Sequence, residues 1–181
     1  MSSDIRIRKG LDIQLKGKAD AITKPAPLAA VYGIKPAEFH RVIPKLIARE
    51  GATLKAGDAV FYDKRDERVL FPSPVSGTIT EIIRGERRKI LEIRITPDAT
   101  QSFQDFGKKE VNSLSPEQIK EHLLESGAWP LIKQRPYDVI ASVDSQPKAI
   151  FISACKTNPL APDYDYVLKG KEKELQVALT A

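Results

Sequence analysis

Four side chains in this sequence could act as nucleophiles, ligands or attachment points, and they lie far apart in the chain. Cys155 follows an apolar run, where its thiol could be redox-active, although a lone cysteine at a strand end is more often a small buried hydrophobe. His40 and His122 have no second ligand or nucleophile close by in sequence, which disfavours metal and triad roles. Lys64 follows Asp63 in a turn-like segment, where its amine could be joined covalently to a prosthetic group. A single cysteine allows neither an internal disulfide nor a cysteine-ligated iron–sulfur or zinc site.

Residues 49–95, which surround that lysine, have turn residues that predict many short β-strands. Gly51 and Gly57 both suit turns that need a positive backbone angle. Residues 78–83 begin with alternating apolar and polar side chains, the pattern of a half-buried strand, and residues 90–95 form a second apolar run. Short strands separated by Gly and Pro turns are typical of a small barrel or sandwich.

This β-rich segment resembles the biotinyl and lipoyl carrier domains, which are barrel-sandwich hybrids. A lipoyl domain carries its modified lysine at the tip of the hairpin between two half-repeats, in a context that Asp63-Lys64 and Ser73-Pro74-Val75-Ser76-Gly77 partly match. However, the spacing from Lys64 to the Ser-Pro corner is longer than in typical lipoyl domains, residues 65–68 are all charged, and the Met-Lys-Met signal of biotin carriers is absent. We therefore expect the carrier fold with a solvated Lys64, and keep a biotinyl or lipoyl carrier modified at Lys64 as an alternative.

The charge balance is modestly basic. The 181 residues include 29 Lys and Arg against 24 Asp and Glu, a net charge of +5. Such a surplus suits an acidic partner or a membrane surface and does not establish nucleic-acid binding, so no nucleic-acid partner is expected. Basic residues gather at one turn, where they could face lipid headgroups or a partner protein, or simply be solvated: Arg84, Arg87, Arg88 and Lys89. No apolar run approaches the roughly 20 residues that span a bilayer.

The expected fold class is α+β, in three parts. Residues 1–100 form the barrel-sandwich β domain, with two short strands within residues 4–15 and a proline-rich segment, residues 19–46, that supplies edge structure or wraps the barrel. Residues 101–114 form a polar linker. Residues 115–181 form the beginning of a truncated α/β domain.

The C-terminal part begins with a helix signal. Ser115 is an N-cap, proline follows it, and Gln118 can close a capping box, while Gly127 marks the end of the helix. Residues 148–154 are predicted to form a buried, parallel strand, and residues 169–179 an amphipathic helix. Because a single βα unit cannot bury its own sheet, this pattern predicts a piece of a longer protein or half of a domain completed elsewhere.

A series of short motifs runs along essentially the whole chain: Lys9-Gly10-Leu11-Asp12, Arg49-Glu50-Gly51 with Gly57, Asp63-Lys64, Ser73-Pro74-Val75-Ser76-Gly77-Thr78, Arg84-Gly85-Glu86-Arg87-Arg88, Gly127-Ala128-Trp129-Pro130, Gln134-Arg135-Pro136 and Thr157-Asn158-Pro159-Leu160. In their order and spacing these motifs resemble the NqrA family, one of the subunits of the Na⁺-translocating NADH:quinone reductase. The family's chains are much longer, which agrees with the truncated α/β unit.

The resemblance also implies a relationship to the flavin- and NADH-binding subunit of complex I. In those relatives a loop of the type Gly-x-Gly-Gly-Ala-Gly-Phe-Pro follows a helix and binds flavin phosphate with backbone amides. The corresponding segment here is Glu125-Ser126-Gly127-Ala128-Trp129-Pro130-Leu131, with one glycine and a bulky Trp129. Lys156 and Asn158 stand where the relatives favour acidic side chains. We therefore expect a nucleotide-binding architecture whose flavin site has been lost, with Trp129 as a core anchor; lining a quinone pocket is its alternative role.

The favoured function is that of a peripheral subunit on the cytoplasmic face of the bacterial inner membrane. It would support electron transfer from NADH to ubiquinone or menaquinone, coupled to Na⁺ export, by docking to membrane and peripheral subunits and by shaping quinone access. No catalytic, cofactor or metal site is expected in this chain; NAD, FMN, FAD, riboflavin, an iron–sulfur centre and quinone belong to the parent complex. Besides the carrier at Lys64, a flavin-binding NADH dehydrogenase fragment remains an alternative.

Overall fold

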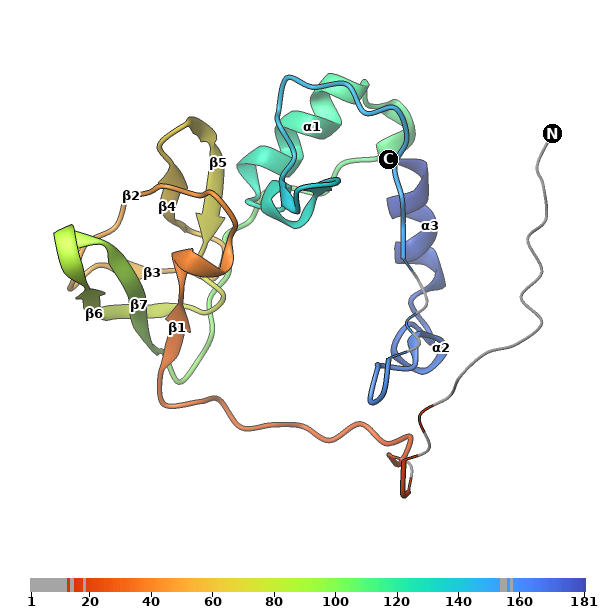
Figure 1. Cartoon of the computed structure of the whole chain (residues 1–181), viewed down its shortest axis with the longest axis horizontal. Helices are drawn as coiled ribbons and strands as arrows, with labels where there is room; N and C mark the ends of the chain where they lie inside the picture. Colours follow the sequence, from red (N-terminus) through yellow and green to blue (C-terminus); the bar gives the residue numbers. More distant parts are fainter. Residues whose placement is uncertain (1–12, 14, 18, 154–155, 157) are drawn as a thin grey trace.

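The computed structural model describes residues 13, 15–17, 19–153, 156 and 158–181 (Figure 1). The strands expected in residues 4–15 fall almost wholly outside this range, as do the Lys9–Asp12 motif and Cys155. Ile13 and Leu15 are described; both are largely exposed and outside any strand.

Seven strands form a two-sheet β domain. The first sheet has the order β1-β7-β6-β3 and comprises β1 (Tyr32–Ile34), β7 (Ile90–Pro97), β6 (Gly77–Arg84) and β3 (Thr53–Leu54). The second has the order β2-β4-β5 and comprises β2 (Pro44–Leu46), β4 (Ala59–Asp63) and β5 (Asp66–Pro72). All neighbours pair antiparallel. The two sheets enclose one apolar core, as a sandwich requires.

Strands β6 and β7 contribute four isoleucines to that core, Ile79, Ile90, Ile93 and Ile95. Ile79, Ile93 and Ile95 are completely buried, and Ile79 pairs with Ile95 across the two strands. The alternation in β6 breaks after Ile79, where the register shifts against β7, as a β-bulge does. From the second sheet, the rings of Phe61 and Phe71 stack with centroids 4.4 Å apart. The turn between β6 and β7 is the 3₁₀ segment η2 (Glu86–Arg88).

The proline-rich segment forms edge structure, as expected, but does not wrap the barrel. Its later part supplies β1, the 3₁₀ turn η1 (Pro36–Glu38) and β2, whose first residue is Pro44 at a sheet edge, where proline costs no ladder bond. Residues 19–30 are exposed and run away from the strands toward α2 (Figure 1), where Thr23 and Tyr166 share a hydrogen bond of 3.2 Å.

The corner at residues 73–77 packs against and hydrogen-bonds to the end of β7 and the chain that follows it. Gly77 crosses the main chain at Thr96 and Pro97 so closely that a side chain at residue 77 would overlap the Thr96 carbonyl. Buried Ser76 accepts a hydrogen bond from the Ser102 amide at 2.9 Å, and its own amide donates to the side chain of Gln101 at 2.8 Å. The first residues of the expected linker are therefore packed on the barrel.

The C-terminal part contains short elements around helix α1 (Pro116–Glu125). Ser115 caps this helix, and with Gln118 it forms the reciprocal capping box that the sequence predicts. The predicted helix at residues 169–179 is confirmed as α3 (Glu172–Thr180). The remaining elements are η3 (Val111–Ser113), η4 (Trp129–Leu131), the hairpin of β8 (Lys133–Gln134) and β9 (Val139–Ile140), and α2 (Tyr164–Val167).

The predicted buried strand at residues 148–154 is wrong for its described part. Residues 148–153 form no strand, and Ile150, Phe151 and Ile152 are 79%, 82% and 60% exposed. A β-strand needs a neighbouring strand for its amides and carbonyls, and no strand among the described residues forms a ladder with residues 148–152. An apolar run therefore predicts a buried strand correctly only when a neighbouring strand is present to pair with it.

Candidate functional site

The loop after α1, where a flavin phosphate would be expected to bind, is built as a helix C-terminus. Gly127 has φ +68°, and its amide donates to the Leu124 carbonyl at 3.1 Å. The Ala128 amide donates to the Leu123 carbonyl at 3.0 Å. This pair of bonds is the Schellman motif, which satisfies the last carbonyls of a helix. Two amides that a phosphate-binding loop would present to its ligand are thus used within the protein.

The glycine of this loop also packs against the barrel. A Cβ at Gly127 would lie 2.7 Å from Cδ of Pro72, the last residue of β5. Trp129 is 9% exposed, and its indole N–H donates to the Ala141 carbonyl at 2.8 Å. This burial and hydrogen bond support the expected role of Trp129 as a core anchor.

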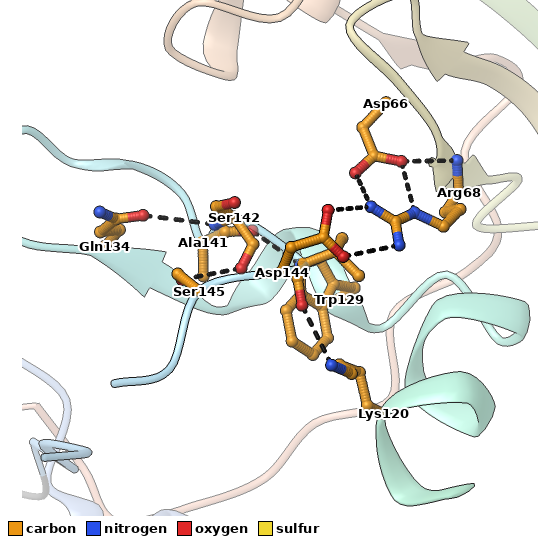
Figure 2. Close-up of polar contacts among 10 residues, drawn as sticks. Asp66, Arg68, Lys120, Trp129, Gln134, Ala141, Ser142, Asp144 and Ser145 are labelled. Atoms are coloured by element: carbon orange, nitrogen blue, oxygen red, sulfur yellow. Dashed lines mark hydrogen bonds and ion pairs between the residues drawn. The ribbon is translucent and has the colours of Figure 1, made fainter. Parts of the chain in front are cut away.

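An arginine of the barrel links the two parts of the chain (Figure 2). Arg68 of β5 donates to both carboxylate oxygens of Asp66 on its own strand, at 2.9 and 2.7 Å. It also donates to both oxygens of Asp144 in the C-terminal part, at 2.9 and 2.7 Å. The hydrogen bonds to Arg68 lower the pKa of Asp66 and of Asp144 below the usual range, and those carboxylates raise the pKa of Arg68. Two bidentate contacts hold the planar guanidinium in one orientation, which a lysine ammonium, acting as a point charge, could not do.

The loop that carries Asp144 is held from the other side as well. Its neighbour Val143 is 2% exposed within the hydrophobic core, and Lys120 of α1 donates to the Val143 carbonyl at 3.2 Å. Gln134 accepts a hydrogen bond from the Ser142 amide at 3.3 Å (Figure 2). We call Arg68, Pro72, Gly127, Trp129 and Asp144 the junction, since they join β5 to the C-terminal part.

The ionic half of the junction is not predicted by the sequence motifs. Arg68 and Asp144 are 76 positions apart, and neither lies in a motif. The run of charges in residues 65–68 favours a solvated tip, although Asp66 and Arg68 point to one side of β5 because they are two residues apart. This two-residue spacing is the sequence signal from which the contact between Asp66 and Arg68 could have been predicted.

The two histidines lie apart and make no metal centre. Nδ1 of His40 lies 3.1 Å from Oδ2 of Asp138, an exposed contact between the barrel and the β8–β9 turn. Nδ1 of His122 is buried without a hydrogen-bond partner in the part of the chain that the structure describes. Within the same residues, no group of three or more His, Cys, Asp or Glu side chains could hold a metal ion.

Lys64 lies where a carrier lysine would, in the exposed turn between β4 and β5. Its surroundings are structural: the Lys64 amide donates to the Ile43 carbonyl at 2.8 Å, and buried Asp63 forms an ion pair of 3.0 Å with Arg65. The main chain of the tip is therefore fixed by its neighbours, while Lys64 itself is exposed to solvent.

Fold and junction together define a class of protein: a carrier-like β domain joined to a small α/β part whose glycine loop has become a helix cap. The sequence pattern of the NqrA N-terminal barrel-sandwich hybrid domain matches residues 5–98, and that of the NqrA second alpha/beta domain matches residues 114–181. The chain belongs to the NqrA family. This confirms the resemblance and the α+β fold class.

Similar proteins include three that are named as the A subunit of Na(+)-translocating NADH-quinone reductase. That of Haemophilus influenzae (strain PittGG) is 36% identical over 178 residues, that of Yersinia pseudotuberculosis serotype O:1b (strain IP 31758) 35% over 178, and that of Marinomonas sp. (strain MWYL1) 33% over 177. In each case the match covers 97% of this chain and 40% of the relative. The chain thus spans about 40% of the length of these curated relatives.

No helix among the described residues has the length and apolar character needed to cross a bilayer.

The loop after α1 does not fit a flavin phosphate, because the Gly127 and Ala128 amides cap the helix and Pro72 covers the glycine. Lys156 and Asn158, at the positions where the flavin-binding relatives favour acidic residues, are both exposed.

Proposed function

We propose that this chain works in a Na⁺-translocating NADH-quinone reductase, as its relatives' names state for them, and that it does so by docking. In this proposal it is a peripheral subunit on the cytoplasmic face of the membrane, associated with membrane and peripheral subunits. It supports electron transfer from NADH to a quinone, coupled to Na⁺ export, and holds no flavin, metal or NAD of its own. Shaping the quinone's access route is its second role.

One observation supports the docking role: the loop at Gly127 caps helix α1 and packs against β5, and so joins two parts of the chain. The Gly127 and Ala128 amides end a helix and Gly127 packs against Pro72, so these two donors are not offered to a phosphate. The same residues hold the barrel at a fixed orientation to α1, and Arg68 and Asp144 reinforce that orientation. A surface of fixed shape made from two parts is what subunit docking requires, because rigid partners lose less freedom on association.

Co-purification tests the proposal. The protein, tagged and expressed with the other reductase subunits, should be retained with the membrane fraction and elute with those subunits. The same protein expressed alone should be colourless, without flavin absorbance. Recovery of flavin in stoichiometric amount with the isolated chain would favour the flavin-binding alternative and overturn the cofactor-free role.

The exposed position of Lys64 at a hairpin tip favours one second candidate, a biotinyl or lipoyl carrier. Co-expression with the cognate ligase followed by intact mass measurement distinguishes the two. The docking proposal predicts the unmodified mass, and an unmodified Lys64 excludes the carrier. A matched Lys64→Arg variant assigns any added mass to this amine, because arginine cannot be acylated in the same way.

A further inference from the structure

A recess on the barrel surface combines apolar walls with a basic rim. Its cavity volume is about 220 Å³. Its floor is made by aliphatic, proline and aromatic side chains, and its edge by His40, Arg41 and Lys89. The apolar lining residues are Pro36, Ala37, Phe39, Val42, Pro44 and Ile90. The recess lies where η1 meets the first residue of β7, beside the β6–β7 turn.

His40 on this rim contacts Asp138 at 3.1 Å, whereas the arginines and the lysine on and beside the rim have no such partner among the described residues. Arg41, Arg87, Arg88 and Lys89 are exposed, and none forms an ion pair among the residues that the structure describes. By contrast, three other arginines of the barrel, at positions 65, 68 and 94, pair with carboxylates. Unpaired cations gathered at two neighbouring turns make a local positive surface that is available to an anionic partner.

Three of these arginines are held in the left-handed backbone region. Arg41 has φ 64°, Arg87 φ 53° and Arg88 φ 61°. Glycine, asparagine or aspartate adopts this region more readily than a long side chain does. Three such arginines, one lining the recess and two in the adjoining β6–β7 turn, therefore oppose the local backbone preference. Residues kept in unfavourable conformations cluster at binding sites, which supports a use for these charges.

We infer that this recess and its rim contact an anionic bilayer surface, with lipid phosphates against the arginines and the apolar recess at the headgroup–acyl boundary. This inference rests on the proposed function, which places the chain beside a membrane. The apolar lining of the recess and the unpaired cations at its rim match a lipid interface better than they match an acidic peptide alone.

Vesicle flotation with the 181-residue chain tests this contact. Wild-type protein should float with vesicles of phosphatidylglycerol and phosphatidylcholine, and remain at the bottom with pure phosphatidylcholine. The test variant is Arg41→Asn, Arg87→Asn and Arg88→Asn, because asparagine tolerates positive φ and should preserve the fold. With about fivefold lost per basic residue, partitioning should fall on the order of 100-fold. A second variant with glycine at the same positions should behave alike.

The matched control removes the same charge elsewhere: Lys148→Gln, Lys169→Gln and Lys173→Gln, all exposed and remote from the recess in sequence. It should lose only a small part of the binding, since its lysines lie off the contact face.

Three results would overturn the inference: no flotation of wild-type protein, equal loss in the test and control variants, or retention of an acidic peptide with no vesicle binding, which would indicate a protein partner. Vesicle binding needs no reductase partner. If flotation fails while co-purification with the reductase succeeds, only this inference fails; if co-purification fails while flotation succeeds, the proposed function fails.

Discussion

Replacing Gly127 with alanine should destabilise the junction by about 2–5 kcal/mol, and the structure separates this value into two parts. An alanine at φ +68° carries the left-handed penalty of roughly 1–2 kcal/mol. Its Cβ would lie 2.7 Å from Cδ of Pro72, and overpacking of this kind costs typically about 1–3 kcal/mol. The first cost is local to the backbone at the end of α1, and the second acts on the contact between that helix end and β5.

Trp129 is the only tryptophan in the sequence and lies in the junction, so its fluorescence during urea denaturation reports this contact directly. Gly107→Ala is the matched control: its φ is +73°, but nothing lies within 4 Å of the added Cβ, so only the left-handed penalty of roughly 1–2 kcal/mol should appear. In a Pro72→Ala background, Gly127→Ala should cost no more than this control does. Equal losses in the Gly127 and Gly107 variants would refute the packing of β5 against the helix end.

Three further variants test other parts of the chain. Arg68→Met should lower the urea midpoint at low salt and much less at high salt, because it leaves Asp66 and Asp144 facing each other. Arg68 lowers the pKa of both carboxyls in the folded protein. Their contribution to stability is therefore present above the unfolded-state pKa of about 3.9 and is lost as pH falls through the lower folded pKa values. In the Arg68→Met variant, urea midpoints measured between neutral and acidic pH should no longer show this loss. Trp129→Phe should cost about 1–3 kcal/mol by circular dichroism, since the part-buried Ala141 carbonyl loses its donor. Ser115→Ala should cost about 1 kcal/mol in the same assay through loss of the helix cap, and Ser115→Asp should restore most of it.

Local signals in the sequence predict the local structure well. The capping box at Ser115 and the Schellman glycine at Gly127 depend on residues within one helical turn, and both are present. The alternation that predicts β6 and β7 likewise depends on short-range periodicity. The hairpin of β8 and β9 escapes prediction because strands of two residues carry no periodic pattern.

The arrangements that depend on distant residues could not be predicted in the same way. The Arg68–Asp144 contact joins positions 76 apart, and no periodicity encodes it. The error at residues 148–154 has a related cause: an apolar run shows that a strand is possible, whereas its burial depends on neighbours that the run does not specify. The position of Arg41 is a third case: the basic turn at residues 84–89 is visible in the sequence, but no sequence pattern brings Arg41 to the same recess as Lys89.

The pairing of the first strand with the last has a consequence for synthesis. Tyr32 pairs with Ile95 and Ile34 with Ile93, so the first sheet cannot close until β7 has been made. At about 5–20 residues per second, the ribosome needs roughly 3–12 s to add the intervening stretch of chain. During that interval β1 has an unpaired edge and Ile93 does not yet exist to cover the core. A chaperone that binds nascent apolar segments would therefore meet this protein most often before residue 97 emerges.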